Sequence, residues 1–232
     1  MGHSGFLGLI AVYYIEADTA EQAWPLKPSS SLDFNWLKMS QGKKEIWKIT
    51  QPLRSKSVFQ PLVMGNMSFI PERSTLLGQE VLPPNLTKLC DLDAFSTVDN
   101  NPYYAVASGL AQVFKFDDKL LTIMNFLQSI NSMRQDYKRL LEPKDARALL
   151  LLAYWYAKVC QTQHWWLWHR AAPEGQGLCI YLGKIIETKP IYRTFFNFQA
   201  SIVATLLAGP RTRRLHHRCT ALQWNKKELI RT

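Results

Sequence analysis

The sequence has few cysteines, and none of them is spaced as zinc ligands are. Cys90, Cys160, Cys179 and Cys219 stand at least 19 positions apart in a chain of 232 residues. No pair of the CxxC type exists, which argues against a zinc site of the usual spacing and against a disulfide framework. A chain of this length buries a sizeable core without such staples. We therefore expect free, mostly buried thiols in a reducing compartment.

Signatures of the common enzyme classes are also missing. The chain contains no GxGxxG, Walker, GxSxG or HExxH motif. His164 and His169 are five positions apart, or about 140° around a helix, so they do not share a face for a metal. His216 and His217 stand among arginines, which repel a cation. A cysteine–histidine nucleophile pair stays open, although no pattern points to one. We predict that the protein is no enzyme and uses no cofactor or metal.

A basic start, as in a secretory signal, is missing at the N-terminus. The short apolar run from Phe6 to Ile15 is followed at once by Glu16 and Asp18, so we do not expect a cleaved signal. Prolines and serines end this region, which is typical of a joint. We predict that residues 1–31 form a flexible, peripheral segment.

No apolar run is long enough to cross a bilayer, which takes about 20 residues. The run from Ala148 to Ala157 has ten residues, and charged residues flank it closely. We predict no membrane span and instead a central helix from Pro143 to Cys160, apolar on all sides because neighbours surround it.

Helical patterns fill much of the remaining sequence. Asn101 and Pro102 suit the start of one helix, and residues 119–141 follow the rhythm of a single amphipathic helix with Lys138 on its polar face. A last helix is expected over residues 195–208, whereas the prolines of residues 51–84 favour loop. The fold class predicted is all-α: an irregular helical bundle or array with a loop-rich N-terminal third and a basic C-terminal tail.

One segment contradicts its own helical pattern. Pro173, Gly175 and Gly177 fall close together, and inside a helix a proline costs about 3 kcal/mol and a glycine about 1 kcal/mol. We therefore predict a broken helix that resumes near Leu178.

Acidic residues are scarce at the C-terminus. The net charge is +10, and the residues after Gly209 include seven basic and one acidic side chain. Such a tail indicates a nuclear import signal or a nonspecific phosphate contact; a solvated terminus without a function is the alternative. The candidate residues are Arg211, Arg213, Arg214 and Arg218. We predict a nuclear location, or a cytoplasmic one if the import signal does not function.

Tryptophans are abundant around the central helix, with three of them at Trp165, Trp166 and Trp168. On a helix the first and the last share a face, and Trp166 points elsewhere. Large aromatics bury much area and often keep an indole N–H near a polar rim. A packing role and an aromatic ligand pocket are both open, and base stacking has weaker support because no extended basic groove adjoins them.

Three segments resemble the regulatory region of fungal Zn(2)-Cys(6) transcription factors, most closely the group related to the sterol-uptake regulators. They are LDFNWLKMSQGKKEIWKITQPLRSKSVFQPL, LPPNLTKLCDLDAFSTVDNNPYYAVASGLAQVF and LLEPKDARALLLLAYWYAKVCQTQHWWLWHRAAPEGQGLCIYL. The similarity covers residues 32–187. It implies an all-helical region that lies C-terminal to a DNA-binding cluster, and control by a ligand that exposes a surface through a population shift.

The chain departs from that family at its ends. The six-cysteine cluster is missing, so we expect no sequence-specific DNA binding by this chain. Residues 1–31 and 188–232 do not resemble the family, and HRAAPEGQGLCIYL replaces a continuous helix. We divide the chain into an N-terminal segment of residues 1–31, a regulatory-like helical domain of residues 32–187, and a diverged helix with the basic tail over residues 188–232.

The resemblance predicts a regulatory domain that binds a small apolar, sterol-like effector or a transcriptional partner protein. The candidate ligand-lining residues are Trp155, Tyr156, Trp165, Trp166 and Trp168. Two alternatives stay open: a basic nucleic-acid-associated protein that acts through its C-terminal tail, and a truncated fragment without a function.

Overall fold

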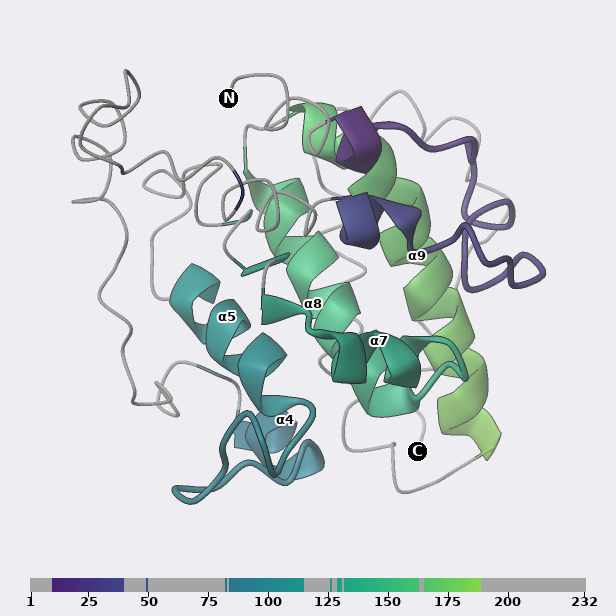
Figure 1. Cartoon of the computed structure of the whole chain (residues 1–232). Helices are drawn as coiled ribbons and strands as arrows, with labels where there is room; N and C mark the ends of the chain where they lie inside the picture. Colours follow the sequence, from purple (N-terminus) through teal and green to yellow (C-terminus); the bar gives the residue numbers. More distant parts are fainter. Residues whose placement is uncertain are drawn as a thin grey trace.

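The computed structural model describes residues 10–39, 49, 82, 84–114, 126, 129–130, 132–162 and 165–188. These residues form α-helices and turns with no strand among them, which confirms the all-α class. Figure 1 labels the helices α4 (Pro84–Leu89), α5 (Tyr104–Phe114), α7 (Gln135–Leu141), α8 (Ala146–Gln161) and α9 (Trp165–Thr188). The predictions for residues 51–81, for the helix over 195–208 and for the basic tail lie outside the described residues.

Helix α8 is the centre of the fold. All ten residues of Ala148–Ala157 are buried, which confirms the prediction of a helix surrounded by its neighbours. Figure 1 shows α8 between α5 and α9, with α7 packed across it. Asp145 caps the start of α8, because its Oδ1 accepts from the N–H groups of Arg147 and Ala148 at 3.1 and 3.0 Å. Among the described residues, no helix combines the length and the hydropathy of a membrane span.

Helix α5 begins at Tyr104, later than the predicted start at Pro102. Asn101 shapes the turn that precedes the helix: its Oδ1 accepts from the N–H of Tyr103 at 2.9 Å. Its Nδ2 donates to the carbonyl oxygens of Cys90 and Asp91 at 2.9 and 3.1 Å. The residue expected to cap α5 therefore ties the turn before α5 to the end of α4, a helix that the sequence analysis did not predict.

The prediction of one helix over residues 119–141 is wrong in the part that the structure describes. Arg134 has an extended backbone with φ −63° and ψ 171°, and α7 begins only at Gln135. The change of direction places Tyr137 in the core, where its hydroxyl donates to the Ala148 carbonyl at 2.6 Å. Lys138, which was predicted on the polar face, is buried, and desolvation lowers the pKa of its ammonium group.

The predicted break after Ala171 is also wrong, because α9 continues from Trp165 through Pro173 to Thr188. One face of α9 is buried at helical spacing, and its members are Leu167, Ala171, Glu174, Leu178 and Leu182. This face packs against α8, and most helical stability in proteins comes from such packing rather than from propensity. The packing of α9 against α8 therefore outweighs the local free-energy cost of Pro173, Gly175 and Gly177 in the helix.

Gly177 has a packing role within α9. A Cβ atom placed there would lie 3.1 Å from the carbonyl oxygen of Ala20 and 3.5 Å from that of Trp24. The absence of a side chain therefore lets the N-terminal part of the chain approach the helix closely.

The segment predicted to be flexible and peripheral, residues 1–31, is described from residue 10 onward, and residues 1–9 lie outside the described residues. Residues 10–27, which we name the N-terminal strap, run along α9 (Figure 1), with Val12, Ala23 and Trp24 buried. Residues 35–39 are helical and place Trp36 in the core. The strap thus covers part of α9.

The three described cysteines are buried, and burial raises the pKa of Cys90, Cys160 and Cys179 to about 12. At pH 8 each thiol then holds about a thousandfold less thiolate than an exposed thiol of pKa about 8.5. We expect a Cys219→Ser chain, which keeps only these three thiols, to resist a chromogenic disulfide reagent while folded. All three thiols should react in denaturant. Rapid reaction of one or more thiols in the folded protein would contradict this burial.

Candidate functional site

Trp155 and Tyr156, two of the candidate ligand-lining residues, lie together in a buried aromatic cluster. Their ring centroids are 5.2 Å apart with an edge-on contact. Trp155 also stacks on Trp36 at 6.1 Å and meets Phe126 edge-on at 6.2 Å. We call these four residues the aromatic cluster. It joins α8 to two segments that lie far from it in the sequence.

The polar atom of Trp155 is satisfied inside the protein. Its Nε1 donates to the Ser129 Oγ at 2.7 Å, and that hydroxyl donates to the Phe126 carbonyl at 2.7 Å. Only 2% of Trp155 and none of Tyr156 is exposed. A ligand therefore reaches these two rings only if a packed side chain moves aside.

Trp168 lies on the first turn of α9, where its side chain is half-buried. Its Nε1 donates to the Val159 carbonyl at 3.1 Å, one turn beyond Trp155 along α8. The hydroxyl of Thr162 donates to the same carbonyl at 2.8 Å. Trp168 thus fastens the end of α8 to the start of α9. The side chains of Trp165 and Trp166 lie outside the described part of the chain.

A buried ion pair adjoins the aromatic cluster, and sequence reasoning missed it. Arg170 and Glu174 are one turn apart on α9, and only 8% of each side chain is exposed. The Arg170 Nη1 donates to Glu174 Oε1, and the Tyr156 hydroxyl donates to Glu174 Oε2. Tyr156 therefore belongs both to the aromatic cluster and to this polar network.

Arg170 extends the network to the N-terminal strap. Its Nε donates to the Val12 carbonyl at 2.8 Å, and its Nη2 donates to the carbonyl of Tyr14. The guanidinium carbon also lies 5.2 Å from the centre of the Trp36 ring, a geometry that favours a cation–π interaction. One side chain of α9 therefore contacts the strap, the aromatic cluster and Glu174.

Burial dominates the electrostatics of this network. It raises the pKa of the Glu174 carboxyl above its usual value, while the charge of Arg170 and the two hydrogen bonds oppose the rise. The charge of Asp33, which pairs with Lys27 at 2.8 Å, raises this pKa further. Burial and the neighbouring Glu174 raise the pKa of Tyr156 well above its usual value. The tyrosine is therefore a neutral donor to the carboxylate at all ordinary pH values.

The sequence did contain one signal for the ion pair, because Arg170 and Glu174 have the i,i+4 spacing of helical neighbours. The predicted break at Pro173 placed them on different elements and hid that signal. The described residues contain no group of three His, Cys, Asp or Glu side chains arranged for a metal ion. The tail candidates Arg211, Arg213, Arg214 and Arg218 lie outside the described residues.

We expect Arg170→Met to destabilise the protein by about 3–5 kcal/mol at pH 7, because it leaves the buried Glu174 carboxylate without its cation. Loss of the guanidinium also raises the folded-state pKa of Glu174 further. A carboxyl whose pKa is raised in the folded state disfavours folding while ionised. This cost disappears as the pH falls from the folded-state pKa towards the pKa of about 4.5 that an unperturbed glutamate has. The deficit against wild type should therefore shrink between pH 7 and pH 5 in urea denaturation.

Arg139→Met is the matched control, because Arg139 makes an ion pair with Asp136 at 3.7 Å in which 69% and 53% of the two side chains are exposed. We expect a change below about 1 kcal/mol for this surface pair. Equal losses in the two variants would show that Arg170 does not hold a buried charge in place.

A comparison of this chain with family models, with curated proteins and with solved structures returns no match. The contacts described above are therefore the structural basis for a proposed function.

Proposed function

We propose that the chain is a regulatory, effector-binding domain related to fungal Zn(2)-Cys(6) transcription factors. It controls transcription through a small apolar, sterol-like molecule or a transcriptional partner protein, and the four cysteines among these 232 residues do not form a six-cysteine zinc cluster. The observation that carries the proposal is the double role of Tyr156. Its ring packs in the aromatic cluster, and its hydroxyl bonds to Glu174, the partner of Arg170.

This double role connects the interior to the surface. An apolar effector that enters beside Trp155 must displace part of the aromatic cluster, because the rings are packed against one another. A shift of Trp36 or Tyr156 changes the surroundings of Arg170, which holds the strap by two of its carbonyls. Binding in the core thereby alters the contacts of the strap that covers α9. Ligand-controlled exposure of a surface requires a coupling of this kind.

The packing of the resembling segments supports the same function. Trp36 belongs to the first segment, α5 to the second, and α8 and α9 to the third. Trp36 stacks on Trp155 of α8, and Phe114 of α5 meets Tyr154 of α8 edge-on at 6.0 Å. Segments that resemble one family in sequence order thus contribute to one core.

The most direct test is stabilisation by a sterol. We expect ergosterol, delivered from cyclodextrin, to raise the melting temperature of the full chain in a concentration-dependent way. At one hundred times the dissociation constant the gain is about 2.7 kcal/mol. Trp155→Leu should abolish the shift, because it removes the ring at the centre of the aromatic cluster.

Trp24→Leu is the matched control, because Trp24 is another buried tryptophan whose ring meets Phe34 rather than the aromatic cluster. This variant should keep the sterol-dependent shift on a lower starting temperature. The absence of a shift in the unaltered chain at the solubility limit of the sterol would count against an apolar effector and leave the partner protein as the regulator.

The charge of the C-terminus favours one second function, nonspecific binding of nucleic acid. Seven basic side chains and one acidic side chain follow Gly209, and contacts to phosphate release counterions. We expect binding of a duplex of arbitrary sequence to weaken steeply between about 50 and 200 mM salt and to vanish when residues 211–232 are deleted. The measurement is fluorescence anisotropy of labelled DNA. Salt-independent binding, or binding that survives the deletion, would contradict a role for the tail.

A further inference from the structure

The N-terminal strap contacts the elements beside it through backbone carbonyls and through the ring of Tyr13, which stacks on His169 of α9 at 5.0 Å. The carbonyl oxygens of Val12 and Tyr14 accept hydrogen bonds from Arg170. Farther along the strap, the Pro25 carbonyl accepts from the Lys144 Nζ at 2.8 Å. Contacts of this kind recognise a main chain of a given shape rather than particular side chains, as in the binding of a peptide.

The apolar contacts of the strap are small. Apart from Val12, Trp24 and Pro25, its buried apolar residues are alanines, and they are Ala17, Ala20 and Ala23. Because apolar stabilisation follows the area buried, the three alanines contribute little. The carbonyl groups of Ala20 and Trp24 approach Gly177 closely, so the shape of the strap backbone must match the surface of α9 at this point. The strap is thus fixed at a few points and not by a broad apolar face.

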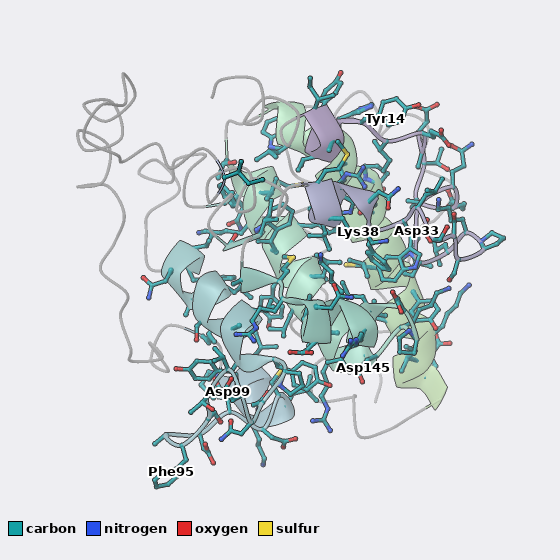
Figure 2. The ribbon with its side chains drawn as sticks, viewed as in Figure 1. Tyr14, Asp33, Lys38, Phe95, Asp99 and Asp145 are labelled. Carbon is teal, nitrogen blue, oxygen red and sulfur yellow. The ribbon has the colours of Figure 1, made fainter. Side chains whose placement is uncertain are left out.

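The strap is joined to the core by an exposed stretch, residues 28–32. Immediately beyond it, Phe34 and Trp36 are buried and hold the chain in place. Figure 2 shows Tyr14 of the strap and Asp33, just beyond residues 28–32, on the side of the molecule where α9 lies, whereas Phe95 and Asp99 lie at the opposite end beside α4. Rotation about residues 28–32 can therefore release residues 10–27, and it breaks the Lys27–Asp33 ion pair and the edge-on contact between Trp24 and Phe34.

We propose that one face of α9, with Arg170 and Gly177 at its centre and Lys144 beside it, is a peptide-docking surface that the N-terminal strap occupies, and that the strap opens as a unit about residues 28–32. This inference deepens the proposed function, because it names the surface that regulation exposes. Only the regulatory purpose of the opening rests on that function. The strap opens in the free protein, without an effector.

Hydrogen exchange by mass spectrometry on the full chain, without any sterol, tests the opening. We expect the strap amides that donate to backbone carbonyls, those of Tyr14, Ala23, Leu26 and Lys27, to exchange at least about tenfold faster than those of α8. The reason is that a part of the structure that opens alone does so at a lower free energy than global unfolding. Equal rates in the two regions would overturn the proposal. Because no effector is present, this result is independent of whether sterol binding succeeds or fails.

Two variants of the docking surface sharpen the test. Lys144→Asn removes the bond to Pro25, and asparagine tolerates the positive φ of 60° at this position. It should speed exchange of the strap about tenfold, since a hydrogen bond to a charged group is lost, and leave α8 unchanged. Lys88→Asn, at an exposed lysine on α4, is the control and should change neither region.

Gly177→Leu blocks the surface by a different route, because its side chain would occupy the space of the Ala20 and Trp24 carbonyls. The strap should lose its protection, and α8 should keep most of its own. If either variant accelerates exchange in α8 and in the strap by the same factor, the strap is an integral part of one folding unit and the proposal fails.

Discussion

A helix that is buried on every side must be covered by other parts of its chain, and α8 places this requirement on the whole fold. Three successive aromatic residues show how it is met. Tyr154 meets Phe114 of α5, Trp155 meets Phe126 and Trp36, and Tyr156 bonds to Glu174 of α9. Since neighbouring residues of a helix point about 100° apart, each ring is directed to a different neighbour. The order of elements around α8 follows from these contacts.

The interior of such a protein needs no charge, yet Arg170 and Glu174 are buried. A buried ion pair is weak evidence of stability, because the cost of taking both charges out of water offsets their attraction. The geometry assigns the pair a positional role here. The guanidinium donates to carbonyls of the strap, which no apolar side chain can replace. The strap is consequently held in one register along α9.

The sequence was sufficient to predict the structural features that depend on local composition. The ten-residue apolar run and the charges that flank it were sufficient to place α8. Trp155 and Tyr156 lie in the interior, as one of the two readings of these residues expected, and their role in lining a ligand site stays a prediction. The continuity of α9 could not be predicted in this way. Gly177 faces the carbonyls of Ala20 and Trp24, so its role depends on a segment that sequence patterns left at the periphery.

The same reason explains why half of the candidate site was missed. The aromatic residues were visible by their type, whereas Arg170 and Glu174 are ordinary residues at an ordinary spacing. Their importance comes from burial and from a hydrogen bond to Val12, which lies 158 positions earlier in the chain. A local sequence pattern cannot relate two residues that lie so far apart in the chain. The helix assigned as broken at Pro173 then separated the two partners of the pair.

The magnitude of the proposed coupling between the core and the strap can be bounded by physical chemistry. An effector shifts a conformational equilibrium only by the difference of its affinities for the two states. If a bound ring turns the Tyr156 hydroxyl away from Glu174, a buried carboxylate loses a donor, which costs about 1–3 kcal/mol. A coupling free energy of this size corresponds to about 5–150-fold in affinity. In the proposed function, the loss of one hydrogen bond from the Tyr156 hydroxyl is therefore sufficient to couple effector binding in the core to the opening of the strap.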